Sequence, residues 1–286
     1  MFIDYASKPP TKEFNPPQQQ HLANYRRVYK ASESRVDKPA DEQAALKKYL
    51  DTYEKLGAKH VVVKARDNET TFGLKVKNED VAAFCKAQGG RFIGFAGVDP
   101  HKGIAAVKEL EFAVRELGLR GLNLQCFELK LAINDKKMYP LYAKCIELDI
   151  PVNIHVGINF STASQMDYGR PAYLDEVMQH FPELRVCASP PGWPWVEELI
   201  GVAWRHANVH IGIVAVRPKL IGMEDAGYRP LLSYGTKVLK DRILTGTSFP
   251  MQPLEQAYAE FDALPLPDDV RRKWMVENAA RFLGLK

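Results

Sequence analysis

Ile150-Pro-Val-Asn-Ile-His-Val-Gly157 is a short run of branched apolar residues that a proline opens and a glycine closes. Such a run is typical of a strand buried on both faces, as in a parallel sheet that helices cover. His155 stands at the carboxyl end of the run. Because functional side chains of a parallel barrel stand at this end of the strands, His155 is the first candidate for a functional residue.

The chain on both sides of this run alternates between strand and helix patterns. Further strands are predicted at residues 1–5, 60–64, 91–98, 119–126, 184–188, 208–214 and 242–246. A helix pattern follows each strand, at a period of roughly 30 residues that is typical of βαβ crossovers. Eight such units predict a protein of the α/β class that forms one closed (β/α)8 TIM barrel over residues 1–286. A doubly wound open sheet is the alternative, which the lack of a Gly-x-Gly-x-x-Gly motif disfavours.

Two segments depart from the regular alternation. Residues 6–40 are polar and rich in proline, so we expect a long loop after the first strand that either covers a functional site or is partly disordered. Asp41 then has the character of a helix N-cap, and Gly57 ends the helix that it starts. At the other end of the chain, the pattern over 268–283 predicts a closing helix.

Composition and charge exclude several classes of protein. The 286 residues are 46% hydrophobic and 26% charged, as in an ordinary globular protein, and the net charge of +4 comes from interleaved acidic and basic residues. We therefore expect no nucleic-acid partner. No apolar run reaches the ~20 residues that cross a bilayer, and four scattered cysteines indicate reduced thiols. These features predict a cytoplasmic protein without a membrane partner, and they are compatible with a homo-oligomer.

Polar residues at the predicted strand ends make up a candidate site. Besides His155, the residues singled out as catalytic or substrate-binding are Asp4, Lys64, Arg66, Ser189, Arg217 and Ser248. The three cations among them favour a small anionic ligand. Each cation could instead be a solvated rim residue. Asp99 also follows a strand, but the turn Pro100-His-Lys-Gly103 after it indicates a helix cap.

Several blocks of the chain resemble a known family. They are Val76-Lys-Asn-Glu79, Arg91-Phe-Ile-Gly-Phe-Ala-Gly-Val-Asp-Pro100, Glu116-Leu-Gly-Leu-Arg-Gly-Leu122, Met138-Tyr-Pro-Leu-Tyr142, Pro151-Val-Asn-Ile-His155, Phe181-Pro-Glu-Leu184, Asn208-Val-His-Ile211, Asp241-Arg-Ile-Leu244 and Glu277-Asn-Ala-Ala-Arg281. Together they resemble the amidohydrolase-related (amidohydrolase 2) metal-dependent barrels, which include aminocarboxymuconate-semialdehyde and resorcylate decarboxylases. The resemblance covers nearly the whole chain after the first loop and implies a TIM barrel.

The resemblance also implies where a metal would bind, and this chain departs from that pattern. In the family the first strand ends in Ile-Asp-x-His-x-His, where this chain has Ala6 and Lys8 in place of both histidines. Ser189 stands near the histidine of the sixth strand, and Ser248 replaces the aspartate of the eighth. His155 alone remains. Since zinc needs three or four nitrogen, sulfur or carboxylate ligands at once, we expect no metal centre of the family type.

Three functions stay open at this point. The first is a metal-independent decarboxylase, lactone hydrolase or isomerase, thus an enzyme of the hydrolase or carboxy-lyase type, that acts on a small carboxylate-bearing substrate. In it His155 is the general acid/base, Asp4 orients a partner or moves a proton, and the three cations hold the carboxylate with Ser189 and Ser248 beside them. The second is a barrel without catalysis that binds a ligand or a partner. The third is a zinc or other divalent metal enzyme with atypical ligands, such as Asp4, Cys126 or Cys187.

Overall fold

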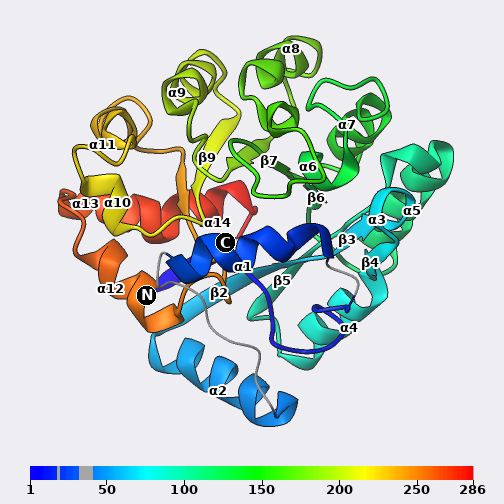
Figure 1. Cartoon of the computed structure of the whole chain (residues 1–286), viewed down its shortest axis with the longest axis horizontal. Coiled ribbons are helices and arrows are strands. Elements are labelled where there is room, and N and C mark those ends of the chain that lie inside the picture. Colours follow the sequence, from blue (N-terminus) through cyan, green and yellow to red (C-terminus); the bar gives the residue numbers. More distant parts are fainter. Residues whose placement is uncertain (18–19, 32–40, 286) are drawn as a thin grey trace.

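Eight parallel strands form the centre of the structure, as the sequence predicts (Figure 1). The computed structural model describes residues 1–17, 20–31 and 41–285. The barrel strands are β1 (Phe2–Ser7), β2 (Ala58–Lys64), β5 (Phe92–Phe95), β6 (Leu122–Leu124), β7 (Val152–His155), β8 (Val186–Ser189), β9 (Val209–Ile213) and β10 (Ile243–Thr245). Each lies within or next to a predicted run, so the expected strand pattern is confirmed.

The strands close into a ring. Three of them pair in the order β1-β2-β5 and five in the order β10-β9-β8-β7-β6, all parallel. Isolated parallel bridges join the two sheets at both seams, between Ala96 and Leu122 and between Ser7 and Phe249. The backbone amide of Lys8 donates to the carbonyl of Phe249 at 2.9 Å, for example. The predicted α/β TIM barrel is therefore confirmed.

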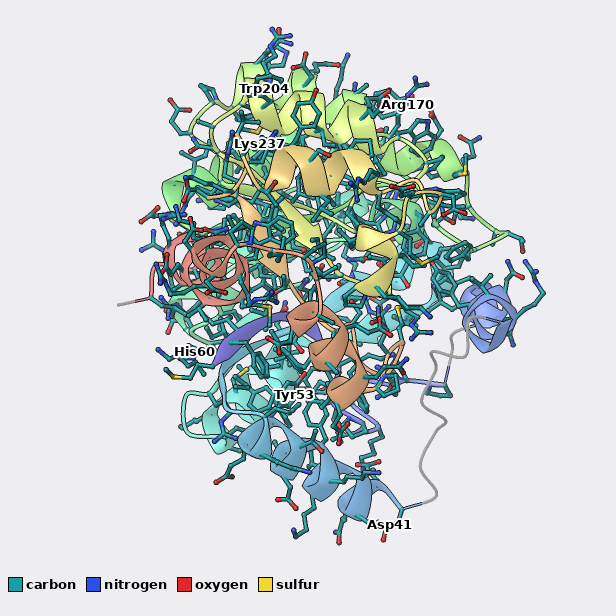
Figure 2. All side chains as sticks on the ribbon, turned by 90° about the vertical axis from the view of Figure 1, so that its left-hand side faces the viewer. Asp41, Tyr53, His60, Arg170, Trp204 and Lys237 are labelled. Carbon is teal, nitrogen blue, oxygen red and sulfur yellow. The ribbon has the colours of Figure 1, made fainter. Side chains whose placement is uncertain are left out.

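Helices surround the ring in Figure 1. They are α2 (Glu42–Lys55), α4 (Asn78–Ala87), α5 (Ile104–Arg115), α7 (Tyr139–Glu147), α8 (Ala172–His180), α9 (Val196–Arg205), α11 (Arg229–Gly235) and α12 (Leu254–Asp262), with the short helices α6 (Cys126–Leu129) and α10 (Lys219–Gly222) at the strand ends. Asp41 lies at the start of α2 (Figure 2). It caps the helix as predicted, because its Oδ1 accepts the backbone amides of Gln43 and Ala44. None of the helices in the described ranges has the length and apolar character needed to span a bilayer.

The barrel strands separate two layers of core. Val61 and Val63 pack in the layer between strands and helices, whereas Val62 packs in a second cluster inside the ring. All three valines are fully buried, which explains why the strands are continuous apolar runs. The predicted closing helix is α13 (Asp268–Arg272) and α14 (Asn278–Phe282) joined by a π-helical turn over Lys273–Glu277. Phe282 of α14 belongs to the inner cluster and so closes one end of the ring.

The long connection after β1 contains a helix that the sequence pattern did not predict. This helix, α1 (Ala23–Ala31), lies across the middle of the ring in the view of Figure 1. Its sequence has a strongly polar average composition, so it could not be recognised as a core helix. The sequence also allowed residues 6–40 to be partly disordered. Residues 18–19 and 32–40 of this range lie outside the described residues.

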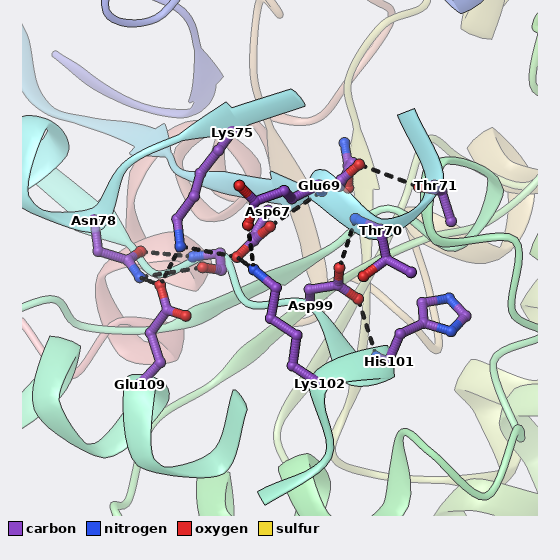
Figure 3. A network of polar contacts seen from close by, with 12 residues as sticks. Asp67, Glu69, Thr70, Thr71, Lys75, Asn78, Asp99, His101, Lys102 and Glu109 are labelled. Atoms are coloured by element: carbon purple, nitrogen blue, oxygen red, sulfur yellow. Dashed lines mark hydrogen bonds and ion pairs between the residues drawn. The ribbon is translucent and has the colours of Figure 1, made fainter. Parts of the chain in front are cut away.

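A small antiparallel hairpin follows β2 and was also not predicted. It comprises β3 (Arg66–Asn68) and β4 (Leu74–Val76), with the single turn α3 (Glu69–Phe72) between them. The buried carboxylate of Asp67 holds the hairpin in place, because it accepts ion pairs from Lys75 at 2.9 Å and Lys102 at 2.7 Å (Figure 3).

Asp99 ties the following strand end to the same hairpin. Its Oδ1 accepts the backbone amide of His101 at 2.9 Å, so the predicted capping role is confirmed, and its Oδ2 accepts the amide of Thr70 at 3.0 Å. The hairpin is thereby fixed from two sides.

Gly97 gives a test of this arrangement. A Cβ at Gly97 would lie 2.5 Å from the backbone of Ala65 and Arg66, which cannot move without shifting the hairpin. We expect Gly97→Ala to lower the free energy of unfolding by at least about 2 kcal/mol. Gly201 in α9 has open space around its Cβ position, and Gly201→Ala should raise the same free energy by about 0.5–1 kcal/mol. Urea unfolding of both variants checks this, and a neutral effect of Gly97→Ala would contradict the packing described.

Candidate active site

A cavity of about 640 Å³ opens at the carboxyl ends of the barrel strands. Its walls come from the strand ends and from the connection that carries α1. The polar and charged side chains that line it are Ser7, Lys8, Gln20, Tyr25, Lys64, Arg66, Asn123, Gln125, Asn153, His155, Ser189, Arg217, Tyr228 and Ser248. Six of the seven predicted site residues thus line one cavity, and Asp4 is the exception.

The charged side chains of the lining are all positive. Lys8, Lys64, Arg66 and Arg217 contribute to the wall, whereas no aspartate or glutamate does among the described residues. A concave, partly buried wall with charge of one sign attracts ligands of the opposite sign. The cavity is therefore suited to an anion.

Arg66 is held by a buried carboxylate. Its Nη1 donates to Glu128 Oε1 at 3.1 Å, and Glu128 also accepts hydrogen bonds from Asn68 at 2.9 Å and from His21 Nε2 at 3.0 Å. Burial alone raises the pKa of Glu128, but the Arg66 charge and the His21 hydrogen bond outweigh it and bring the pKa to about 2. Arg66 Nη2 remains buried without a hydrogen-bond partner among the described residues.

The same carboxylate anchors the cover of the cavity. His21, just before α1, stacks on Phe72 with ring centroids 4.0 Å apart. Asn24 of α1 donates to the carbonyl of Phe160 at 2.9 Å, and Tyr25 meets the Phe160 ring edge-on. Neither His21 nor Glu128 was predicted as a site residue, because a histidine in a long loop and a glutamate in a short helix carry no local signal.

Lys64 at the end of β2 has no carboxylate partner within ion-pair distance among the described residues. Its Nζ donates to Asn153 Oδ1 at 3.0 Å and lies 4.5 Å from the centroid of the Tyr5 ring. Burial lowers the pKa of Lys64 to about 8. The groups that contact the Lys64 ammonium, an amide oxygen and an aromatic ring, are thus neutral.

Amide and hydroxyl side chains fix the partner of Lys64. Asn153 Nδ2 donates to Asn123 Oδ1 at 2.9 Å, and Ser189 Oγ donates to Asn153 Oδ1 at 2.9 Å. Asn123 in turn donates to the carbonyl of Ala65 at 3.0 Å, next to Lys64 in the chain. Asn123 and Asn153 were not predicted as site residues, although a polar residue inside an otherwise apolar strand was the available signal.

His155 lies beside this network. It ends β7, opposite Ser189 of β8 in the strand register, and its ring meets Phe127 edge-on at 4.7 Å between centroids. The side chain is only 6% exposed. Burial lowers the pKa of His155 to about 4, so the imidazole is neutral at pH 7. A neutral imidazole at a cavity wall can accept a proton.

Arg217 and Ser248 line the cavity but have partners within the protein. Arg217 Nε donates to Glu260 Oε1 at 3.0 Å, and Nη2 forms an ion pair with the same carboxylate. Ser248 Oγ accepts the backbone amide of Ala215 at 2.9 Å. Arg217 and Arg66 are thus both paired with a carboxylate. Arg66 differs in that its Nη2 has no partner among the described residues. This nitrogen and the Lys64 ammonium therefore stand out as groups with capacity for a ligand.

Asp4 lies beneath the cavity and does not line it, which differs from the predicted position. Its Oδ2 is 2.7 Å from both the Tyr53 hydroxyl and Thr247 Oγ1, and its Oδ1 accepts the amides of Thr247 and Ala6. Burial raises the pKa of Asp4, although these hydrogen bonds oppose the effect. With both oxygens occupied and no exposed surface, Asp4 braces the ends of β1 and β10, and the geometry does not support direct catalytic contact.

The family of the chain follows from a comparison with known proteins. A profile described as Amidohydrolase matches residues 21–285. The chain belongs to the amidohydrolase family. This confirms the family that the sequence blocks resemble.

Three solved structures show the same fold. An uncharacterized TIM-barrel protein from Bordetella bronchiseptica is 28% identical, with a TM-score of 0.80 over 99% of this chain and 98% of that one. A 5-carboxyvanillate decarboxylase from Sphingomonas paucimobilis is 17% identical, with a TM-score of 0.69 over 100% and 99%. A dihydroxybenzoic acid decarboxylase from Polaromonas, with bound manganese and an inhibitor, is 16% identical, with a TM-score of 0.68 over 99% and 96%.

The residues of this amidohydrolase do not fit a divalent metal ion. The positions at which the resemblance implies ligands all line the cavity, where they carry Ala6, Lys8, His155, Ser189 and Ser248. One imidazole nitrogen is left, since both hydroxyls already bond within the protein. No cluster of three or more His, Cys, Asp or Glu side chains occurs in the part of the chain that the structure describes. Such a donor set falls short of what zinc or manganese requires.

The atypical metal ligands suggested by the sequence, Asp4, Cys126 and Cys187, do not supply the missing donors. Cys126 and Cys187 are fully buried, and neither lines the cavity. Neither sulfur therefore adds a ligand to those at the strand ends. Asp4 is occupied by its hydrogen bonds, as described above.

Replacement of Glu128 tests whether its carboxylate holds Arg66 and His21 in place. Its pKa of about 2 lies below the ordinary 4.5, so the carboxylate contributes stability that is complete above pH 4.5 and is lost as the pH falls towards 2. We expect Glu128→Gln to lower the free energy of unfolding by about 3 kcal/mol at pH 7, with a difference from wild type that narrows below pH 4.5. Urea unfolding between pH 3.5 and 7 measures this.

The matched control is Glu147→Gln. Glu147 forms an exposed pair with Lys144, so its replacement should change the same free energy by less than about 0.5 kcal/mol. A difference for Glu128→Gln that is equally small, or that does not vary with pH, would contradict the anchoring role of Glu128.

Proposed function

We propose that this amidohydrolase is an enzyme that acts without a metal ion on a small carboxylate-bearing molecule in the cavity at the strand ends. The observation that carries the proposal is the lining itself, in which every charged side chain is positive and none is acidic. The remaining wall is largely apolar and includes Phe127, Phe160 and Trp193. This combination suits an organic acid whose body is apolar or aromatic.

Arg66 and Lys64 are the groups that would hold the carboxylate. Arg66 Nη2 is a buried donor without a partner among the residues that the structure describes, and leaving such a donor unsatisfied is costly. Glu128 fixes the guanidinium so that this nitrogen keeps its position. Lys64 adds a cation within the same lining. Ser189 and Ser248 are assigned a secondary role, because their hydroxyls already bond within the protein.

His155 is the proposed general acid/base. Its imidazole is neutral in the empty cavity, because burial lowers its pKa to about 4, and a bound carboxylate nearby would raise that pKa towards neutrality. Because His155 can accept a proton and later donate it, it can act in decarboxylation, lactone opening or isomerisation. The decarboxylase names of two structures with the same fold make the removal of a carboxylate the first reaction to test.

Turnover provides the first test. Carbon dioxide release would be measured with 5-carboxyvanillate, 2,6-dihydroxybenzoate and related aromatic acids, before and after treatment with a chelator. We expect turnover to survive the chelator, because the donor set does not fit a metal, and His155→Gln to lower kcat by about 100- to 10,000-fold. The control is His180→Gln, at the end of α8 and exposed, which should leave kcat unchanged.

The other outcomes separate the alternatives. Loss of turnover in the chelator and recovery with manganese would contradict a metal-independent reaction, and full activity of His155→Gln would contradict the assigned base. Tight binding of acids without turnover of any would favour a ligand-binding barrel, a candidate that the replacement of the family's ligands at Ala6, Lys8, Ser189 and Ser248 motivates.

Binding as a function of pH provides a second test. Because the pKa of Lys64 is about 8, its positive charge is present below that pH and is lost above it. Affinity for an unreactive benzoate should therefore weaken as the pH rises through 8, and Lys64→Gln should weaken binding at pH 7 by about 10- to 100-fold and remove this pH step. Titration calorimetry measures both. Lys237→Gln on the outer surface (Figure 2) should change neither.

A further inference from the structure

We propose that Lys64 forms an imine with a carbonyl carbon of the substrate, so that the acids handled by this cavity are oxo acids. The inference rests on the proposed function and adds to it a covalent step and a narrower substrate class. It assigns to Lys64 the role of nucleophile in addition to that of cation.

The surroundings of Lys64 differ from those of Lys75 and Lys102, two partly buried lysines at the neighbouring hairpin. Lys75 and Lys102 each contact the Asp67 carboxylate within 3 Å, and such pairing keeps an amine protonated. Lys64 instead contacts the amide oxygen of Asn153 at 3.0 Å and the face of Tyr5. Lys64 lines a cavity large enough for a small organic acid. This is the environment of a lysine that can lose its proton and attack a carbonyl.

The amide network holds the nucleophile in one place. Asn153 Oδ1 accepts from both Lys64 and Ser189, and its Nδ2 donates to Asn123. The acceptor therefore cannot turn away without breaking three hydrogen bonds. A neutral acceptor of this kind positions the amine without stabilising its charge strongly, as a carboxylate would.

The protonation state of Lys64 agrees with this role. Burial lowers its pKa to about 8, although Cys187 and the Asp4 carboxylate act in the opposite direction. At pH 7 about one lysine in ten is then the free amine, against fewer than one in a thousand for an ordinary lysine. At pH 7 most Lys64 side chains thus keep the positive charge that attracts the acid, while a small fraction is the free amine that can react.

The reaction balances without a further reagent. The Lys64 nitrogen bonds to the carbonyl carbon and gives up one proton, and the oxygen takes up a proton to give a carbinolamine. A further proton from solvent converts the hydroxyl to water, which leaves to give the protonated imine. In a 3-oxo acid the bond to the carboxylate carbon then breaks, carbon dioxide leaves, and the electron pair moves to the imine nitrogen to give an enamine. A proton adds to the enamine carbon, which gives an imine again. Water then hydrolyses this imine and releases the ketone and Lys64.

His155 can serve the proton transfers of this sequence. Its neutral imidazole can take the proton that Lys64 loses when the carbinolamine forms. The resulting imidazolium can pass that proton to the carbinolamine oxygen. After a new proton arrives from solvent, the imidazolium can supply the proton that the enamine carbon accepts. His155 lies in the same cavity lining as Lys64, so these transfers take place within one enclosed space.

Reductive trapping tests the imine. Sodium borohydride would be added to the full-length protein with pyruvate, acetoacetate or benzoylacetate, and in parallel with the corresponding hydroxy acids, which carry the same charge but no carbonyl. We expect one adduct per chain with at least one oxo acid, mapped to Lys64 by peptide mass spectrometry, and none with its hydroxy counterpart. Lys64→Arg should form no adduct, whereas Lys237→Gln should form it as wild type does.

Calorimetry with the hydroxy acids separates the two proposals. Binding of the hydroxy acids together with no adduct from any oxo acid would overturn the imine and leave the proposed function standing. Neither binding nor adduct would overturn both. An adduct of equal yield on several lysines, or one that persists in folded Lys64→Arg, would also overturn the assignment to Lys64.

Discussion

The buried carboxylate of Glu128 is the interaction on which the rest of the site depends. It has no exposed surface and cannot remain charged without compensation. That compensation comes from Arg66 and Asn68 of the hairpin and from His21 ahead of α1. One charge therefore fixes the position of the Arg66 guanidinium and attaches the cover of the cavity to the barrel. The connection that carries α1, before β2, and the hairpin that follows β2 are thereby held together at the cavity.

The cavity is organised by neutral dipoles where the amidohydrolase family relies on metal ligands. Hydrogen bonds run from Asn123 through Asn153 to Ser189 and Lys64. Of these residues, Ser189 stands at a position where the resemblance implies a metal ligand. Lys64 is the positive group of this arrangement. A lysine amine is a positive centre that can gain and lose a proton.

The fold was readable in the sequence because each strand is buried on both faces and so carries a continuous apolar run, as Val61, Val62 and Val63 do. Caps such as Asp41 and Asp99 are local signals and were also readable. The hairpin after β2 was not, because three-residue strands are too short to show a period and their stability comes from Asp67 and its lysines. Helix α1 was missed because the contacts that hold it are distant in the chain.

The sequence by itself determined the barrel, the family and the placement of His155, Lys64 and Arg66 at the ends of their strands, since these depend on periodic burial and on strand polarity. Only the tertiary structure decided which of these side chains have partners. Arg217 and Asp4 looked equivalent to Lys64 and Arg66 in the sequence, but Glu260 binds the guanidinium of Arg217 and four hydrogen bonds occupy Asp4. Arg66 is also paired, with Glu128, but keeps one donor without a partner among the described residues. The physical reason is that charge compensation and burial are set by groups far apart in the chain, which no local pattern records.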